Sequence, residues 1–263
     1  MRPLAFAKYE GLGNDFIVVD GDVSDEAAFT TERVRALCDR RFGIGGDGVL
    51  LILPPRTKGA VGRMKVLNAD GSIPEMCGNG LRCAALHLLK GEAGEVLVDT
   101  DDGAKRCSID SDHRVTTDMG EVKWLEDITL DVLGRPLSFA LATAGNPHAI
   151  TFVPFGREEI DRIGPYVATH PHFQRGTNVE FASLRPSARD VDLVVWERGV
   201  GLTLACGTGA CATVATLVAK NQIPEGECVH VHLPGGVLDV TMREGRAIMA
   251  GPARLVFKGA LDA

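Results

Sequence analysis

The sequence predicts an α+β fold of two pseudo-symmetric domains, each built of mostly antiparallel strands around a central helix. The main observation is an internal repeat, because Cys-Gly-Asn-Gly at residues 77–80 is echoed by Cys-Gly-Thr-Gly at 206–209, 129 positions later. A second pair, Gly13-Asn14 and Gly145-Asn146, lies 132 positions apart. Since both pairs keep the same order and nearly the same spacing, two similar domains explain them better than chance does.

The repeat spacing also predicts where the domains divide. We expect the junction between Glu126 and Asp131, with an N-terminal domain of residues 1–128 and a C-terminal domain of residues 129–263. Two related halves that face each other would bring the two Cys-Gly-x-Gly turns to one shared cleft.

Hydrophobic patterning predicts the individual elements. Residues 31–41 predict a helix, with a Thr cap and apolar residues at Val34, Leu37 and Cys38. Two further helices, at about 80–90 and 209–220, begin directly after the repeated motifs, and their apolar residues on nearly every side predict burial. Apolar, β-branched runs predict strands at 16–19, 96–98, 191–196, 229–233 and 255–257.

Composition places the chain among soluble globular proteins, with 45% hydrophobic and 24% charged residues among 263. A net charge of −7 offers no basic surface for nucleic acid or acidic lipid, and the apolar runs are too short to span a membrane. The N-terminal apolar run is also too short for a secretory signal. We therefore expect a cytoplasmic protein without nucleic-acid or membrane partners, whose seven cysteines are reduced.

Cys77 and Cys206 are the strongest candidates for chemistry, because each precedes a Gly-x-Gly segment that opens a helix. The unpaired amides at a helix start favour a nearby anion, so we expect a lowered thiol pKa and room for a substrate carboxylate. A lone cysteine is more often a buried packing residue, but matched positions in two halves favour a functional pair. The expected packing cysteines are Cys38, Cys83, Cys107, Cys211 and Cys228.

Two opposed thiols suit the inversion of a stereocentre. A thiolate on one face of a carbon acid removes the proton, and a thiol on the other face returns one. This racemisation needs no cofactor if the site stabilises the carbanion-like transition state. The two helix starts supply N–H groups for the carboxylate whose negative charge grows.

The motifs resemble those of the diaminopimelate epimerase family over nearly the whole chain, from Tyr9 to about Phe257. The resemblance implies a cofactor-independent conversion of LL- to meso-diaminopimelate, in lysine and peptidoglycan precursor synthesis. It also implies an active site in the cleft between two domains, a homodimer, and a segment after Gly251 that packs back on the first domain. The matching segments are Tyr9–Phe16, Asn68–Gly71, Met76–Cys83, Gly145–His148, Thr177–Phe181 and Trp196–Gly209.

Residue roles follow from this resemblance by position. Cys77 and Cys206 correspond to the two acid/base thiols, and His148 and Glu197 to the neighbours that tune them. Glu197 would also contact the reacting amino group, and no metal or cofactor is implied. The backbone amides that would hold the reacting carboxylate are those of Gly78, Asn79, Gly207 and Thr208. The substrate contacts, chiefly at the distal end, would be Asn14, Asn68, Asn146, Asn178 and Arg198.

These residue types suit a small amino-acid substrate on physical grounds. The planar guanidinium of Arg198 matches a carboxylate. Side-chain amides both donate and accept hydrogen bonds, which suits a ligand with two ammonium and two carboxylate groups. Two positions depart from the family pattern, because Gly48 stands where many relatives have Gln and Leu202 where Glu is common. The alternative is therefore a racemase of the same fold that acts on another amino acid.

Other motifs point elsewhere more weakly. Residues 43–48 match the dinucleotide fingerprint Gly-x-Gly-x-x-Gly, but they follow a helical segment and precede a strand, which reverses the required context. A thiol hydrolase that pairs one cysteine with His148 would leave the second matched cysteine without a role. His230 and His232 share one strand face, and two ligands do not make a metal site. A non-catalytic amino-acid-binding protein of this architecture would not need both Cys77 and Cys206.

Overall fold

A computed structural model describes residues 3–74, 76–187 and 189–262 of the chain. The chain forms two compact units, one of residues up to Thr117 together with those from Gly251 onward, and one of Asp118–Ala250. The expected junction at 128/129 falls inside the continuous strand β8 (Lys123–Val132). The chain instead passes between the units within β7 (Arg114–Glu121) and returns within β16 (Arg246–Pro252).

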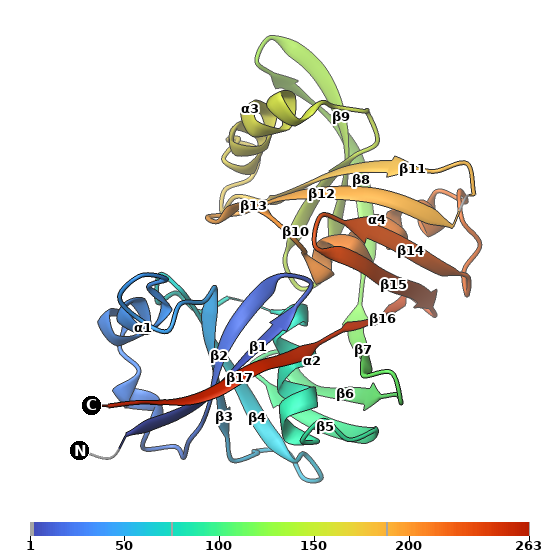
Figure 1. The fold of residues 1–263 in the computed structure, drawn as a ribbon. Helices are drawn as coiled ribbons and strands as arrows, with labels where there is room; N and C mark the ends of the chain where they lie inside the picture. Colours follow the sequence, from blue (N-terminus) through green and yellow to red (C-terminus); the bar gives the residue numbers. More distant parts are fainter. Residues whose placement is uncertain (1–2, 75, 188, 263) are drawn as a thin grey trace. The chain divides into compact units, whose positions relative to one another are not determined.

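The first unit is a mixed sheet whose strands pair in the order β17, β1, β2, β3, β4, β5, β6, β7 (Figure 1). The β2–β3 and β4–β5 pairs are parallel, and the others are antiparallel. The remaining strand bounds are β1 (Leu4–Gly11), β2 (Asn14–Asp20), β3 (Gly48–Leu53), β4 (Gly62–Asn68), β5 (Gly94–Thr100), β6 (Gly103–Ile109) and β17 (Arg254–Leu261).

Two α-helices cover opposite faces of strand β3 in this unit. The central helix α2 (Gly78–Leu88) packs in a core cluster with Leu50, whereas α1 (Thr31–Cys38) packs in another with Val49 and Leu51. Since successive side chains of a strand point to opposite faces, this alternation places the helices on the two sides. A 3₁₀ turn, η1 (Glu26–Ala28), precedes α1.

The second unit repeats this arrangement, with strands in the order β8, β9, β10, β11, β12, β14, β15, β16. Here the β10–β11 and β12–β14 pairs are parallel, and the short strand β13 (Gly201–Thr203) pairs with β12. The remaining bounds are β9 (Arg135–Thr143), β10 (Pro147–Thr151), β11 (Asn178–Leu184), β12 (Asp190–Glu197), β14 (Cys228–Leu233) and β15 (Gly236–Arg243).

Helix α4 (Gly207–Ala219) is the central helix of the second unit and is buried from Gly207 to Leu217. Helix α3 (Arg157–Ala168) was not among the predicted elements. Its residues Ile160, Ile163 and Val167 pack in one cluster with strand residues, at the spacing of one helix face. The sequence signal was obscured by Gly164 and Pro165 in its middle.

The parallel strand pairs show the pseudo-symmetry residue by residue. In the first unit β2 and β3 align Phe16 with Gly48 and Val18 with Leu50. In the second unit β10 and β11 align His148 with Asn178 and Ile150 with Glu180. Both pairs therefore have the same register, and the structure confirms the predicted α+β fold of two similar halves.

The other predicted elements are largely confirmed. All five predicted strands exist, and the helices after the repeated motifs are found at 78–88 and 207–219. The helix predicted over 31–41 ends at Cys38, with Thr30 as its cap. Gly13 and Gly145, the repeated turn glycines, both have a positive φ, of 81° and 87°. In the described part of the chain, no helix is long and apolar enough to cross a membrane.

Candidate active site

The two repeated cysteines cap the two central helices in the same way. Cys77 is the N-cap of α2, with φ −139° and ψ 95°, and Cys206 is the N-cap of α4, with φ −126° and ψ 108°. The Cys77 Sγ accepts a hydrogen bond from the Gly80 amide at 3.2 Å, and the Cys206 Sγ accepts one from the Gly209 amide at 3.4 Å. We call residues 77–80 the Cys77 turn and residues 206–209 the Cys206 turn.

Polar side chains from α4 and from the start of β10 (Pro147–Thr151) lie beside the Cys206 turn. The Thr208 Oγ1 lies 3.5 Å from the Cys206 Sγ and accepts a hydrogen bond from Asn146 Nδ2 at 3.4 Å. Asn146 in turn lies 2.8 Å from His148, between its Oδ1 and the imidazole Nε2. The structure thus joins four of the predicted site residues in one continuous chain.

His148 is buried on β10, with 1% of its surface exposed. Its Nδ1 lies 2.6 Å from Oε1 of Glu180, a fully buried residue of β11. Glu180 was not among the predicted site residues, although it lies within the family motif Thr177–Phe181. Alternation along β11 places it on the same face as Asn178, which was the available signal.

Glu197, Arg198 and Asn178 form a second group beside the Cys206 turn. The Glu197 carboxylate accepts a hydrogen bond from Thr203 Oγ1 at 2.6 Å. The Arg198 amide donates to Asn178 Oδ1 at 2.9 Å, and its guanidinium donates to the Arg175 carbonyl at 3.1 Å. The turn after β12 therefore fixes the backbone of Arg198 against Asn178.

The expected lowering of the thiol pKa is wrong for Cys206. Burial raises its pKa well above the ordinary value, and the carboxylate of Glu197 raises it further. The hydrogen bonds from Thr208 and Gly209 act in the opposite direction but are weaker. Desolvation disfavours the charged form more than the helix start favours it, so this thiol is held protonated.

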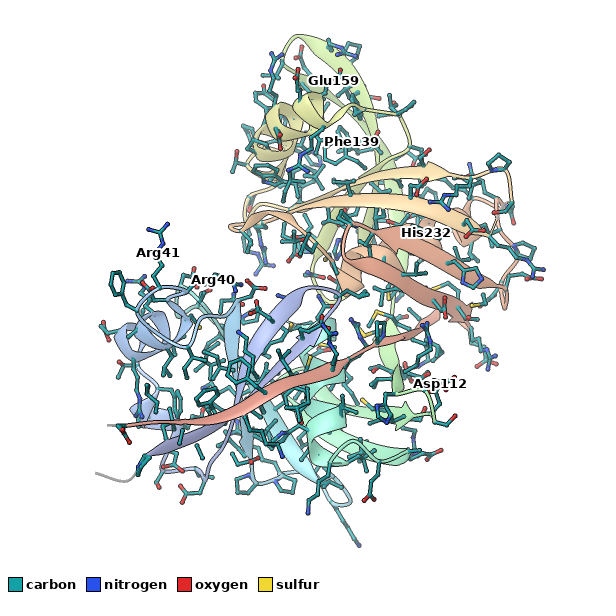
Figure 2. All side chains as sticks on the ribbon, viewed as in Figure 1. Arg40, Arg41, Asp112, Phe139, Glu159 and His232 are labelled. Atoms are coloured by element: carbon teal, nitrogen blue, oxygen red, sulfur yellow. The ribbon has the colours of Figure 1, made fainter. Side chains whose placement is uncertain are left out.

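A chain of hydrogen bonds between side-chain amides extends from the Cys77 turn. Asn79 Nδ2 donates to Asn14 Oδ1 at 3.1 Å, and Asn14 Nδ2 donates to Asp47 at 2.8 Å. Arg40, labelled in Figure 2, then bridges Asp47 and Asp15 at 2.7 and 2.6 Å. Two predicted substrate contacts, Asn14 and Asn79, thus lie together.

The buried side chain of Arg82 donates a hydrogen bond to the Asn79 end of these bonded amides. It is fully buried on α2, and its Nη2 donates to Asn79 Oδ1 at 2.9 Å. Its Nε donates to the Pro252 carbonyl at 3.3 Å. Asn68, another predicted contact, instead hydrogen-bonds to Ser72 at 3.0 Å within its own turn. Arg82 stands in the Met76–Cys83 motif, and no feature of the sequence alone showed that it is buried.

The other cysteines divide into buried and exposed. Burial raises the pKa of both Cys38 and Cys107 to about 11 and that of Cys83 still higher, and Cys211 is also buried. The expectation of a buried packing residue is wrong for Cys228, which is exposed on β14. It lies on an outer face of the sheet, where successive outward positions of β14 meet solvent.

The paired histidines of β14 lie on this outer face, as predicted. His230 lies 2.7 Å from Asp239, and His232, labelled in Figure 2, lies 2.6 Å from Asp190. Donor atoms of Cys228, His230 and Asp239 lie within 4.8 Å of one another. Each histidine is thus paired with a carboxylate on this face of the sheet.

The dinucleotide-like glycine run, residues 43–48, lies between α1 and the buried strand β3. This is a helix-to-strand connection, as predicted, whereas the dinucleotide fingerprint requires a strand followed by a helix. Gly48 itself starts β3, opposite Asn68 of β4.

Comparison with known proteins identifies the family. The family model described as diaminopimelate epimerase matches residues 6–125 and 140–256. The chain belongs to the diaminopimelate epimerase family. A diaminopimelate epimerase of Synechocystis is 41% identical over 97% of this chain and 98% of its own length, and one of Desulfitobacterium hafniense is 41% identical over 98% of both. The resemblance seen in the motifs is confirmed, and the protein is an isomerase of the amino-acid epimerase type.

Solved structures of more distant proteins share the fold. A hydroxyproline epimerase from Agrobacterium vitis superposes with a TM-score of 0.76 at 18% identity, over 100% of this chain and 94% of its own. A phenazine biosynthesis protein of the PhzF family from Bacillus anthracis superposes with a TM-score of 0.74 at 15% identity, over the full length of both. These likenesses confirm the epimerase-like fold.

Proposed function

We propose that the protein converts LL-2,6-diaminopimelate to meso-diaminopimelate without a cofactor, in lysine and peptidoglycan precursor synthesis. The observation that carries the proposal is the matched pair of helix-capping cysteines, in a chain of the diaminopimelate epimerase family. The sequence departures at Gly48 and Leu202 do not favour a particular other substrate.

The chemistry assigns complementary roles to the two thiols. One cysteine as thiolate takes the proton from the α-carbon, so a C–H bond breaks and an S–H bond forms. The other cysteine as thiol then delivers its own proton to the opposite face of that carbon. The buried Cys206, whose pKa is raised, suits the thiol role in the resting enzyme, which assigns the first proton abstraction to Cys77.

The helix starts stabilise the intermediate. Negative charge grows on the substrate carboxylate as the proton leaves the α-carbon. The first turns of α2 and α4 offer oriented backbone donors for this charge. These donors are the amides of Gly78 and Asn79 in α2 and of Gly207 and Thr208 in α4. The side chains of Asn14, Asn68, Asn146, Asn178 and Arg198 would bind the remaining groups, chiefly at the distal end, and Glu197 would bind the reacting amino group.

The test of this proposal is proton exchange. Reduced protein is incubated with LL-diaminopimelate in D₂O, and the α-proton is followed by NMR while the meso product is separated by chromatography. We expect deuterium uptake together with meso product. No uptake and no product would overturn the proposal, and turnover of another amino acid in a parallel panel would redirect it to a different substrate.

The requirement that both thiols meet one substrate has its own test. If they do, mild oxidation should join Cys77 to Cys206 in a disulfide, abolish activity, and be reversed by a thiol reductant. Peptide mapping under non-reducing conditions identifies the bond. Oxidised protein that is inactive but carries no Cys77–Cys206 peptide would contradict the shared site.

We further propose that the protein acts in the cytoplasm as a homodimer. Strand β17 supports self-association, because its apolar side chains Leu255, Val256, Phe257 and Leu261 are 40–50% exposed. An exposed apolar strand of this kind favours burial against a second surface. Light scattering after gel filtration should give twice the 28.0 kDa chain mass, and Phe257→Glu should shift it to the monomer.

A further inference from the structure

Glu180 is a buried acid for which the proposed reaction has no direct use. None of its side chain is exposed, and its Oε1 lies 2.6 Å from His148 Nδ1. Within the described residues, its other oxygen, Oε2, has no hydrogen-bond partner. An ionised carboxylate with an unpartnered oxygen in such a place is costly, which favours a proton on this group.

The hydrogen bonds of His148 fix how many protons the pair holds. Its Nε2 faces Asn146 Oδ1, and the Asn146 amide is oriented by donation from its Nδ2 to Thr208. Since a carbonyl oxygen only accepts, Nε2 must carry a hydrogen. The contact between Nδ1 and Oε1 then requires one further proton, on either atom, so the Glu180–His148 pair is neutral overall.

Burial agrees with this assignment. It raises the pKa of Glu180, and although the imidazole of His148 and nearby backbone amides act in the opposite direction, burial outweighs them. The carboxyl also lies against the Cys206 turn. A Cβ built on Gly209 would lie 2.8 Å from Glu180 Oε1 and 3.3 Å from Cys206 Sγ.

The first unit shows that the fold itself does not need this pair. At the same strand register it places Phe16 where the second unit has His148, and Leu50 where it has Glu180. A Cβ built on Gly80 would likewise lie 3.1 Å from both Leu50 Cδ2 and Cys77 Sγ. Apolar side chains therefore fill the matched positions, and the polar pair is specific to the Cys206 side.

We propose that Glu180 is a positioning residue for Cys206. It shares a proton with His148 Nδ1 and so keeps the Nε2 hydrogen directed at Asn146. From there the hydrogen-bond chain runs through Thr208 to the Cys206 thiol. This inference rests on the proposed function only in treating Cys206 as a proton-transferring thiol. Beside this neutral pair, the charged group that acts on the thiol is the Glu197 carboxylate of β12.

The first test reads the imidazole directly and needs no substrate. In ¹⁵N-labelled protein, we expect His148 Nε2 to carry the hydrogen that faces Asn146. In Glu180→Gln the side-chain amide can donate to Nδ1, so the same tautomer should persist. In Glu180→Leu, which copies Leu50 of the first unit, this preference should be lost. An unprotonated Nε2 in the unaltered protein would overturn the proposal.

The second test measures charge through the alkylation rate of Cys206 with iodoacetamide across pH, followed by peptide mass spectrometry. Because the pair is neutral, Glu180→Gln should leave this rate at neutral pH within about twofold. A lone carboxylate beside Cys206 would instead be removed by the same change and would speed alkylation about tenfold or more, for a pKa change of about one unit. That acceleration would overturn the neutral pair. Glu158→Gln, on the exposed surface of α3, is the matched charge control.

The third test is activity. Glu180→Leu should lower kcat by roughly tenfold to a hundredfold with little change in KM, by analogy with partners that orient metal-bound histidines. An unchanged kcat would overturn the positioning role. If the unaltered protein does not turn over diaminopimelate but shows the expected NMR and alkylation results, the proposed function fails while the assignment of the pair stands.

Discussion

The Cys77 turn and the Cys206 turn share a backbone and differ in their surroundings. In each, a cysteine in an extended conformation caps a buried helix and accepts a hydrogen bond from the glycine three residues later. Around Cys206 are the titratable side chains of His148, Glu180 and Glu197. Around Cys77 are amides and an ion-paired cluster, with Phe16 and Leu50 at the positions matched to His148 and Glu180.

This difference shows which features belong to the fold and which to the chemistry. The cap, the two glycines and the strand register occur twice, so they are the common scaffold. The His148–Glu180 pair occurs only beside Cys206, so it is a specialisation of one half. A two-thiol inversion starts with one thiol protonated and the other ionised, and the surroundings of Cys206 favour its protonated form.

The largest expected effect comes from removing either thiol. Cys77→Ser and Cys206→Ser should each lower kcat/KM about 10³-fold, because a hydroxyl in place of the thiol is a poor proton donor and acceptor for a carbon acid. The measurement is the rate of meso-diaminopimelate formation. Cys228→Ser, on the exposed face of β14, is the control and should retain full activity. If one turn tolerates serine, the two halves do not act as an acid/base pair.

The buried arginine of the first unit should matter next, for stability. Arg82→Met removes the donor of the hydrogen bonds to Asn79 Oδ1 and to the Pro252 carbonyl, which should lower the free energy of unfolding by about 2 kcal/mol. Urea denaturation measures it. Arg41→Met, at an exposed position, should stay within about 0.5 kcal/mol of the unaltered protein. An equal decrease in the free energy of unfolding of both variants would show that the Arg82 hydrogen bonds do not stabilise the fold.

Asp15 forms ion pairs in the first unit, whereas the matched position in the second unit is the uncharged Pro147. The two units should therefore differ at this position in how acid affects stability. Burial raises the pKa of Asp15, but hydrogen bonds from Arg40 and Lys8 outweigh it and lower the pKa from 3.8 to about 2. A lowered pKa stabilises the fold above pH 3.8, and this stabilisation is lost as the pH falls through 2.

Asp15→Asn should therefore lower the free energy of unfolding at pH 7 by about 1–2 kcal/mol. The difference from the unaltered protein should shrink as the pH falls from 4 towards 2. Chemical denaturation at several pH values measures it. A deficit that is constant over the whole range would mean that packing, rather than the ion pairs, is responsible.

The smallest effect comes from a matched pair of glycine substitutions. Gly209→Ala places a Cβ 2.8 Å from the pinned Glu180 carboxyl, whereas Gly80→Ala meets Leu50 and Cys77 at 3.1 Å. Displacing Glu180 from its rotamer costs about 1 kcal/mol, so Gly209→Ala should lower kcat about fivefold and more than Gly80→Ala does. Steady-state kinetics compare the two. The reverse order would contradict the special position of Glu180.

The features of this protein that its sequence predicts are those encoded in short runs of consecutive residues. The strands, the helix caps and the repeat were predictable, because alternation, cap residues and spacing are written in consecutive residues. Helix α3 was missed because Gly164 and Pro165 disfavour a helix. Tertiary packing explains that glycine, since a Cβ there would lie 2.7 Å from the Trp196 ring.

The sequence by itself determined the two-domain α+β plan, the pair of matched cysteines and the family, because each is carried by motif order and spacing. Only the tertiary structure decided how those motifs are surrounded. Burial reversed the expected pKa direction at Cys206. The packing of the strands and helices left Cys228 exposed and brought Glu180 to His148 and Arg82 to Asn79. Burial and contact depend on which distant strands and helices pack together, and no short stretch of sequence contains that information.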